Sequence, residues 1–293
     1  MELCSDSMRV VKTLLNRCVD VVDLLAARPG PSRLSDIAGA LGLPKSAAHR
    51  LLRELCMLGW VEQDRADGPY RLTLRFGLLG QRVMLATGLL DLTRPLLERL
   101  AAETRELARL TIVTGAGVTG AGVTGSGVTG SGLAWLSSAQ GAPPGLMYQP
   151  AMDGPVVLHA TANGKAWLAA MPDDQALDLA RRGGLGQAMP TSRTMTEETA
   201  LLADLAGVRA RGYAVADQEA ELGVTAVAVA LPDRRMGTVS VAGPSARLAE
   251  ERFDALAAAL TSAAAGLAMV WPAHARGPAV VAAATAAGKG PGS

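Results

Sequence analysis

Residues 32–74 constrain the fold of this chain most, because they read as a helix, a tight turn, a second helix and a short hairpin in immediate succession. Ser32 can cap the first helix, and apolar residues follow it at helical spacing. Gly42 suits a left-handed helix end, and Pro44, which has no N–H to lose, fits the first turn of the next helix. The order predicts a small domain whose second helix packs across the first.

The second helix, expected from about Pro44 to Leu58, has one apolar and one polar side. At 100° per residue the apolar side collects Ala48, Leu51, Leu52 and Leu55, and the opposite side collects Ser46, His49, Arg50 and Arg53. The apolar side can pack on an earlier helix around Val10–Ala27. The polar side then faces outward with donors for phosphates and base edges.

Two strand-like segments, Trp60–Glu62 and Tyr70–Leu72, flank an Asp67-Gly68 turn and form a wing that would carry Arg65 and Arg71 toward a DNA backbone. We therefore predict a winged helix-turn-helix that places a helix in the major groove. The predicted DNA-binding residues are Ser35, Lys45, Ser46, His49, Arg50, Arg53 and Arg65. The alternative is an ordinary three-helix bundle with a solvated basic face.

Composition and charge agree with a protein that binds DNA phosphates through its N-terminal part. The 293 residues suffice for two domains, and aromatic residues make up only 3%, so the core must consist of Ala, Leu and Val. Residues 1–82 hold 12 Lys/Arg and 9 Asp/Glu, a net charge of +3. Because that charge is modest, two copies acting together are expected on double-stranded DNA.

No pattern of catalytic or metal-binding residues is visible in the sequence. Cys4, Cys18 and Cys56 form no disulfide framework, the three histidines lack metal-ligand spacing, and there is no Gly-x-Ser-x-Gly motif. We expect no catalytic residue, metal or cofactor; His159 as a base is the only support for an enzyme. The absence of a signal-peptide core and the cysteine usage favour the cytoplasm.

A tandem pentapeptide begins at Val113 and continues to residue 132. It contains a literal GxGxxG at Gly115–Gly120, but a dinucleotide-binding fingerprint must lead from a strand into a helix, and this one leads into more Gly and Thr. We interpret the repeat as an expanded loop between two hairpin strands. Trimming it to one copy is therefore expected to leave folding and DNA binding intact.

The remaining chain alternates helices and strands. Helices are expected at Leu72–Ala86, Asp91–Leu110, Gly164–Met171, Asp173–Arg182, Thr196–Arg211 and Glu250–Val270, and strands at Leu133–Ser137, Val156–Leu158, Thr225–Leu231 and Thr238–Ala242. Short loops between strands favour a largely antiparallel sheet. The uncharged run Ala255–Ala273 is expected to pack as a terminal helix, with a membrane span as the alternative.

These segments give an α+β protein with four parts. We expect a winged helix-turn-helix DNA-binding domain over 1–74, a linker helix over 75–90, and a C-terminal α/β effector-binding domain over 91–272, with the repeat at 113–132 as an insertion. Residues 273–293 are expected to be a disordered tail.

Several motifs together resemble the IclR family of bacterial transcriptional regulators. They are Leu34-Ser-Asp-Ile-Ala, Leu43-Pro-Lys-Ser-Ala-Ala-His-Arg-Leu-Leu, Tyr70-Arg-Leu, Leu158-His-Ala-Thr-Ala-Asn-Gly-Lys-Ala, Arg211-Gly-Tyr-Ala-Val-Ala-Asp-Gln-Glu and Ser240-Val-Ala-Gly-Pro. The resemblance covers about Val10 to Trp271 and implies homodimers or homotetramers on palindromic operators. It also implies a sensing domain for a small organic acid, and no association with a membrane.

The resemblance places an effector pocket at Thr161, Ala162, Gly164, Asp217, Ala226, Ser240 and Ala242. Three alanines, Ala216, Ala226 and Ala242, stand where polar groups are expected in members that sense small 2-oxo acids. A small polar anion would then lack hydrogen-bond partners for its charged oxygen atoms, so we expect an aromatic or otherwise semi-apolar acid. Two alternatives stay open: Asp217 and Glu219 lie in a solvated loop, or the domain serves only oligomerisation or partner binding.

Overall fold

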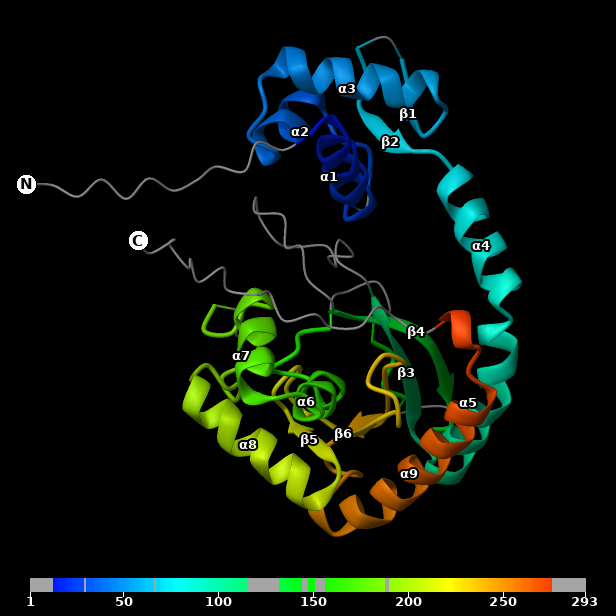
Figure 1. Cartoon of the computed structure of the whole chain (residues 1–293), viewed down its shortest axis with the longest axis vertical. Helices are drawn as coiled ribbons and strands as arrows, with labels where there is room; N and C mark the ends of the chain where they lie inside the picture. Colours follow the sequence, from blue (N-terminus) through cyan, green and yellow to red (C-terminus); the bar gives the residue numbers. More distant parts are fainter. Residues whose placement is uncertain are drawn as a thin grey trace, which may run out of the picture. The chain divides into compact units, whose positions relative to one another are not determined.

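The computed structural model describes residues 13–28, 30–65, 67–114, 132–143, 147–150, 156–187 and 190–275 (Figure 1). These residues form two compact units, one ending at Val83 and one beginning at Met84. The division falls inside the segment expected to be a linker.

The N-terminal unit is a three-helix domain with a two-stranded wing. Its elements are α1 (Leu14–Ala26), α2 (Leu34–Ala40), α3 (Lys45–Met57), β1 (Val61–Gln63) and β2 (Tyr70–Leu72). The core holds Val21, Leu25, Ile37, Leu51, Leu52, Leu55, Val61 and Tyr70. Gly42 has φ +61° at the turn between α2 and α3, as its position in the sequence predicts. The winged helix-turn-helix fold is confirmed.

Ser32 does not cap the first helix, which corrects the sequence-based expectation. The residue before α2 is Arg33, and its side chain makes no capping bond. The backbone of Ser32 instead exchanges two hydrogen bonds of 2.8 Å with Tyr70, and its hydroxyl accepts one from Arg28. The extended Ser32 thus forms an antiparallel bridge with Tyr70, which satisfies the backbone N–H and C=O groups of that residue of β2. The preceding helix also begins later than expected, at Leu14, because Thr13 caps it.

Two helices follow the wing, α4 (Arg75–Thr87) and α5 (Leu89–Thr104), with Gly88 between them at φ +63°. The helix expected over Asp91–Leu110 is therefore shifted. It ends at Thr104 because Arg105 takes a left-handed conformation, and Leu107 already belongs to a strand. The buried side of α5 consists of Leu89, Thr93, Leu97, Leu100, Ala101 and Thr104, whereas Leu92 is exposed.

The second unit is built on one antiparallel sheet, as predicted. Its strands are β3 (Leu107–Thr114), β4 (Gly132–Gln140), β5 (Ala214–Asp217), β6 (Val224–Ala230) and β7 (Thr238–Pro244), in the order β4-β3-β7-β6-β5. The strand expected at Val156–Leu158 is wrong, because that segment turns into the next helix through hydrogen bonds to Val157 O. The short β5 was not expected. Residues 115–131, which hold most of the pentapeptide repeat, lie outside the described residues.

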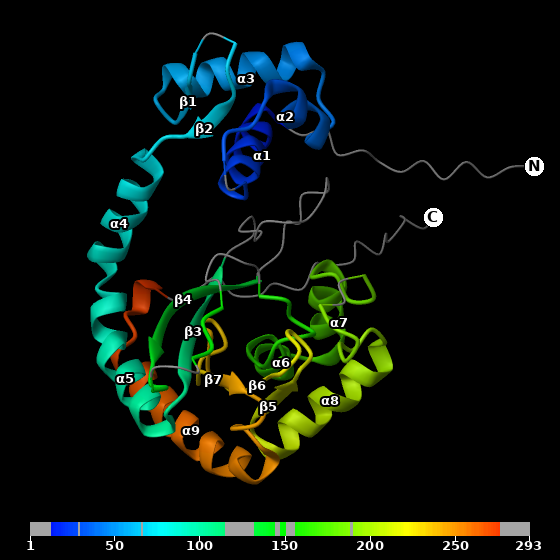
Figure 2. The ribbon, with the colours of Figure 1, turned by 180° about the vertical axis from the view of Figure 1, so that it is seen from behind.

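Helices cover both faces of the sheet (Figures 1 and 2). On one face lie α6 (Ala162–Ala169), α7 (Asp173–Arg182) and α8 (Glu198–Arg211), and on the other lie α5 and α9 (Phe253–Val270). Two short 3₁₀ turns, η1 (Glu250–Arg252) and η2 (Ala273–Ala275), flank α9. Alternate residues of a strand point to opposite faces, so Thr238, Ser240 and Ala242 face α6 while Val239 and Val241 face α9.

The segment Glu250–Val270 is long and apolar enough to cross a membrane by length and composition. In the structure its helix α9 buries Leu256, Leu260, Ala264 and Leu267 in the core between α5 and the sheet. These contacts favour the expectation of a terminal helix packed on its own domain. Residues 276–293, most of the expected tail, lie outside the described residues.

Candidate nucleic-acid interface and ligand pocket

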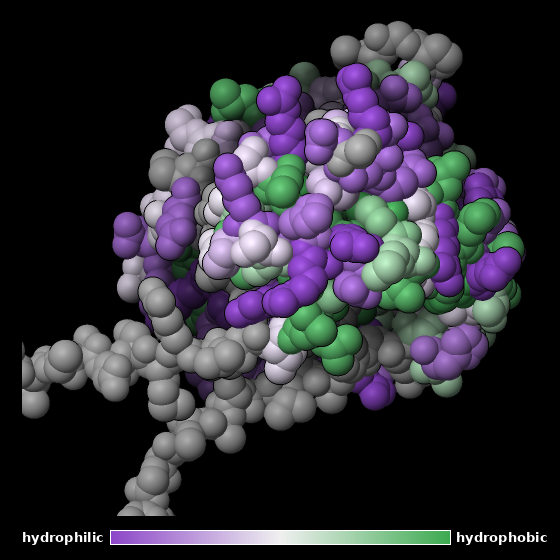
Figure 3. Space-filling view, turned by 90° about the horizontal axis from the view of Figure 1, so that it is seen from above, coloured by the Kyte–Doolittle hydropathy of each residue, from purple (hydrophilic) through white to green (hydrophobic). Residues whose placement is uncertain are grey.

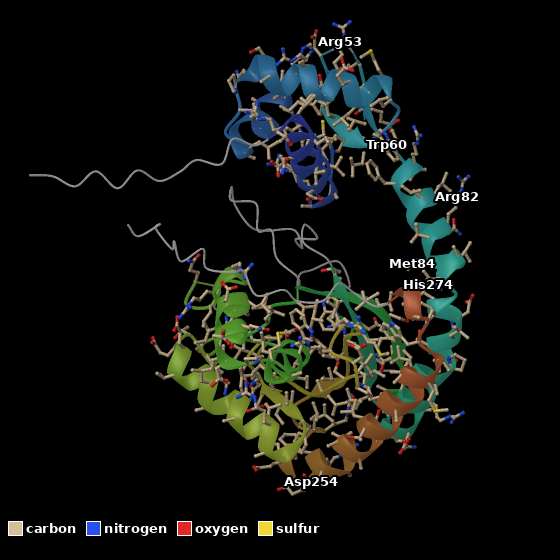
Figure 4. The ribbon with its side chains drawn as sticks, in the orientation of Figure 1. Arg53, Trp60, Arg82, Met84, Asp254 and His274 are labelled. Carbon is tan, nitrogen blue, oxygen red and sulfur yellow. The ribbon has the colours of Figure 1, made fainter. Side chains whose placement is uncertain are left out.

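The polar side of α3 faces outward along its whole length. Ala48, Leu51, Leu52 and Leu55 are buried on the inner side, while Lys45, Ser46, His49, Arg50 and Arg53 are exposed. Figure 4 shows Arg53 projecting away from the core of this unit. A helix anchored in this way can present donors to base edges without moving its backbone.

A groove of about 670 Å³ runs between the starts of α2 and α3 and the wing. It brings together four predicted residues, Ser35, Lys45, His49 and Arg65, whereas Ser46, Arg50 and Arg53 lie outside its lining. Hydrophilic side chains gather on the face of this unit that Figure 3 shows. The concentration of cations along the groove suits it to a phosphate backbone.

Two basic residues differ from what the sequence suggested. Arg33 lines the groove and was missed, although a basic residue directly before a helix start was a usable signal. Arg71 was expected near the DNA backbone, but its guanidinium pairs with Glu62 (2.6 Å) and Asp64 (3.2 Å) on the wing itself. The charge of Arg71 is thus largely compensated within the protein.

A second cavity, of about 40 Å³, lies in the C-terminal unit between the start of α6 and the sheet. Five of the seven predicted effector residues line it: Thr161, Ala162, Ala226, Ser240 and Ala242. The other lining residues are Arg109, Trp135, Tyr148, Asn163, Ala216, Ala220 and Val224. The cavity therefore has an alanine-rich wall with a few polar groups around it.

The start of α6 supplies hydrogen-bond donors to this cavity. The hydroxyl of Thr161 accepts from Gly164 N (3.1 Å), and Thr161 O accepts from Lys165 N (3.0 Å). Among the described residues, no acceptor is found for the N–H groups of Ala162 and Asn163. These N–H groups carry the positive end of the helix dipole and favour a negatively charged or oxygen-bearing ligand.

Ser240 offers a further donor or acceptor in the same cavity. Its side chain is 1% exposed, and its Oγ atom has no hydrogen-bond partner in the described part of the chain. A buried hydroxyl without a partner costs free energy that a bound ligand can recover.

Gly164 and Asp217, although predicted, are not among the cavity-lining residues. A Cβ atom at Gly164 would lie 2.3 Å from Leu158 O, so this glycine allows α6 to pack against the preceding turn. The carboxylate of Asp217 accepts from Thr225 Oγ1 (2.8 Å) and pairs with Arg193 (3.3 Å). Neither residue therefore lines the cavity. Gly164 allows the close packing of α6, and Asp217 bonds across β5 and β6 to Thr225.

Six lining residues of the cavity were missed from the sequence: Arg109, Trp135, Tyr148, Asn163, Ala220 and Val224. Arg109 is 6% exposed, and its guanidinium carbon lies 3.2 Å from the centroid of the Trp135 ring. Burial lowers the pKa of Arg109 to about 10. Burial also raises the pKa of Tyr148, whose hydroxyl donates to Glu221 (3.0 Å).

A buried ionic cluster lies behind the cavity. Lys165 Nζ lies 2.8 Å from Glu219 Oε1 and 3.0 Å from Asp204 Oδ2. The hydroxyls of Thr191 and Thr194 hold the backbone of the same loop by donating to Gln218 O (2.7 Å) and Glu219 O (2.6 Å). The cluster thus ties α6 and α8 to the loop that carries Ala220.

The described residues contain no group of three or more His, Cys, Asp or Glu side chains arranged to hold a metal ion. Cys18 and Cys56 are free, and burial raises the pKa of both thiols. His159 is fully buried outside the lining of both cavities.

Comparisons with known proteins give matches to both units. Residues 14–65 match the IclR helix-turn-helix domain, and residues 153–269 match the model described as bacterial transcriptional regulator IclR C-terminal. The HTH-type transcriptional regulator BhcR of Paracoccus denitrificans (strain Pd 1222) is 32% identical over 262 residues, covering 85% of this chain and 84% of that protein.

Solved structures share the fold. The crystal structure of a transcriptional regulator from Alicyclobacillus acidocaldarius has a TM-score of 0.69 and 23% identity, covering 88% of this chain and 98% of the other. The crystal structure of a homolog from Microbacterium hydrocarbonoxydans complexed with 4-hydroxybenzoate has a TM-score of 0.63 and 24% identity, covering 88% of this chain and 99% of the other.

Proposed function

The chain belongs to the IclR family of bacterial transcriptional regulators, and on that premise we propose that it binds a palindromic operator as a homodimer or homotetramer and releases or engages it in response to a small organic acid. DNA-binding transcriptional regulation is the function of the family. Our proposal concerns the kind of operator, the acid and the residues that contact each of them.

The DNA-binding part of the proposal is supported by the positions of the predicted residues on the N-terminal unit, which fall into two groups. Ser46, Arg50 and Arg53 stand on the outer face of α3, where side chains reach base edges in the major groove. Ser35, Lys45, His49 and Arg65 surround the adjacent groove and contact phosphates. Replacing Arg50 by Ala is expected to cost about 1–3 kcal/mol of operator binding if it reads a base.

A dimer is proposed from exposed apolar side chains. They lie on the helix after the wing, at Leu78, Leu79, Val83 and Leu85, and on α1, at Leu14, Leu15 and Val19. Large apolar side chains gathered in water mark a protein contact. Two copies also double the modest positive charge of the DNA-binding segment and match the two halves of a palindrome.

The chemistry of the cavity supports an acidic effector. Ser240 Oγ, the N–H groups of Ala162 and Asn163, and the cation of Arg109 all favour oxygen atoms or negative charge, while the alanines favour an apolar body. An effector can change DNA affinity only by binding one conformation of the protein more tightly than another.

The size of the cavity bears on which acid is bound. A dry cavity of roughly 150 Å³ holds a benzene molecule, whereas this one measures about 40 Å³. An acid of a few non-hydrogen atoms therefore fits as the walls stand. An aromatic acid such as the 4-hydroxybenzoate of the M. hydrocarbonoxydans homolog requires a larger cavity than this one.

The small volume also favours a second candidate function, in which the C-terminal domain serves oligomerisation or partner binding alone. The two candidates differ in a mobility-shift assay with DNA from the region upstream of the protein's own gene. A change in the shifted fraction with pyruvate, glyoxylate, benzoate or 4-hydroxybenzoate supports the effector. An unchanged fraction with all four acids favours the second candidate.

A further inference from the structure

The C-terminal end of α3, the helix proposed to read DNA, is closed by hydrogen bonds within its own unit. Gly59 has φ +72°, and its N–H donates to Cys56 O (2.9 Å), while the N–H of Trp60 donates to Leu55 O (2.9 Å). This pair of bonds is a Schellman motif, which satisfies carbonyl groups of the last helical turn. The chain therefore leaves α3 in a defined direction, through Trp60 and into the wing.

The next three carbonyl groups, those of Leu58, Gly59 and Trp60, all accept hydrogen bonds from the segment that begins α4. Arg75 Nη1 donates to Leu58 O (2.6 Å). Thr73 donates twice, from its hydroxyl to Gly59 O (2.9 Å) and from its N–H to Trp60 O (3.0 Å). A guanidinium at the last carbonyl of a helix is also favoured by the negative end of the helix dipole. The end of α3 is thus bonded directly to the start of α4.

Stacked rings and a cation strengthen the same connection. The guanidinium carbon of Arg75 lies 4.2 Å from the centroid of the Trp60 ring, and the Phe76 ring lies 4.7 Å from that ring at an angle of 48°. Both distances are typical of attractive contacts with an aromatic ring. Figure 4 shows Trp60 where the wing meets α4. We call Trp60, Thr73, Arg75 and Phe76 the α3–α4 junction.

Beyond this junction, α4 gains little support from its own chain. No side chain of Arg75–Thr87 is fully buried, and Leu78, Leu79 and Val83 are exposed. An isolated helix of this length is marginally stable in water, so its direction depends on the contacts at its ends and on any partner. The α3–α4 junction therefore determines the angle at which α4 leaves the reading helix.

That angle matters for a dimer on a palindrome. The exposed apolar residues of α4 belong to the proposed dimer contact, and α3 lies on the other side of the junction. The angle between the two helices then decides how far apart the two reading helices of a dimer stand. Each added base pair moves a half-site by about 3.4 Å along the duplex and by about a tenth of a helical turn around it. A small change in the angle is therefore enough to change the preferred spacing.

We propose that the α3–α4 junction sets the spacing between the two half-sites of the operator, with Thr73 and Arg75 as positioning residues. The outer face of α3 decides which bases each half-site contains, and the junction decides the distance between the half-sites. This inference rests on the proposed binding of a palindromic operator by a homodimer.

The test uses the full chain and the half-site that the wild-type protein enriches from random duplexes. Two inverted copies of that half-site are separated by spacers of about 0–12 base pairs, a little more than one helical turn, and the bound duplexes are sequenced. Wild-type protein is expected to favour one spacer over the neighbouring lengths by about tenfold or more. The double variant Thr73→Val/Arg75→Met lacks both side-chain donors and the stacked cation. Its preference is expected to fall to within about threefold, with the half-site sequence unchanged.

Control variants separate the geometry of the junction from a general loss of charge. Arg82→Met removes an exposed cation further along α4 and is expected to keep the wild-type preference for one spacer (Figure 4). Thr73→Ser keeps the hydroxyl donor and is expected to keep that preference as well, whereas Thr73→Val alone is expected to weaken it. If the double variant does not fold, Thr73→Val and Arg75→Met are compared singly, each with a smaller expected loss of preference.

The outcomes distinguish this inference from the proposed function. Junction variants that keep the wild-type preference for one spacer overturn the role of the junction and leave operator binding standing. Variants that enrich a different half-site sequence also overturn it, because the junction would then act on base reading. Wild-type protein that enriches the half-site at every spacing overturns both the inference and the palindromic dimer. Wild-type protein that enriches no sequence overturns operator binding, and the inference falls with it.

Discussion

Lys165 Nζ lies 2.8 Å from Glu219 Oε1, and both side chains are almost entirely withdrawn from solvent. Asp204 completes the cluster from α8, 3.0 Å from the same nitrogen. Lys165 follows the residues of α6 that line the cavity, and Glu219 precedes Ala220, which lines it from the other side. The pair therefore fixes two walls of the cavity relative to each other.

Removing the cation of this cluster is expected to be costly. Lys165→Met leaves the buried Glu219 without its cation, whereas Asp204, 20% exposed, keeps Arg211 at 3.5 Å, so the free energy of unfolding is expected to fall by about 3–5 kcal/mol, mainly through Glu219. The matched control is Arg181→Met, which breaks the exposed pair of Arg181 with Glu198 and is expected to cost much less, because solvent screens an exposed pair. Urea denaturation measures both; equal losses would contradict the account.

The stability of the same domain is expected to depend on pH through Glu219. Burial raises the pKa of this carboxyl above its ordinary value of 4.5, and Lys165 only partly opposes the shift. A raised pKa in the folded state means that the contribution of Glu219 to stability is full below pH 4.5 and is lost as pH rises through the folded-state pKa.

Glu219→Gln isolates this contribution, because other titrating groups are common to both proteins. The difference in unfolding free energy, wild type minus variant, is expected to decrease as pH rises from below 4.5 toward neutrality. Urea denaturation at a series of pH values measures it. A difference that grows with pH would show that Lys165 outweighs burial.

The fold was predictable where local patterns act alone. The apolar stripe of α3, the left-handed Gly42 and the apolar strands β6 and β7 each depend on a few neighbouring residues, and the structure contains all three. Ser32 was misassigned because its partner, Tyr70, is remote in sequence. A hydroxyl before an apolar run looks like a cap until that pairing is known.

The cavity was only half predictable for the same reason. Residues near α6 and on the last strands follow from the family resemblance, but Arg109 lies in a segment that helical spacing assigned to the end of a helix. Arg105 ends α5 in a left-handed conformation that non-glycine residues seldom adopt, so no local residue pattern signals the end of this helix. Once β3 is recognised, an arginine between buried Ala108 and Leu110 becomes a strong functional signal.

Close packing of α6 should make Gly164 intolerant of a side chain. A Cβ atom there would meet Leu158 O at 2.3 Å, so Gly164→Ala is expected to lower the melting temperature or prevent folding. Gly80→Ala, in a helix with open space around the glycine, is expected to raise stability by about 0.5–1 kcal/mol. Thermal unfolding of both variants is the check; a neutral Gly164→Ala would contradict the packing.

Phosphate contacts and base contacts should respond differently to salt. Lys45→Ala and Arg65→Ala are expected to weaken DNA binding for all sequences and to reduce the slope of log K against log salt by about 1 each. Arg99→Ala, far in sequence from the groove residues, serves as the control. Fluorescence anisotropy at several salt concentrations measures the slopes, and slopes equal to wild type would remove both residues from the interface.

The central claim is that the outer face of α3 reads a DNA sequence. Selection of bound duplexes from a random pool tests it most directly, with wild-type protein and the double variant Arg50→Ala/Arg53→Ala. The account predicts that wild-type protein enriches a palindromic sequence and that the double variant, folded equally well, does not. Enrichment of the same palindrome by both proteins, or of none by the wild type, would contradict it.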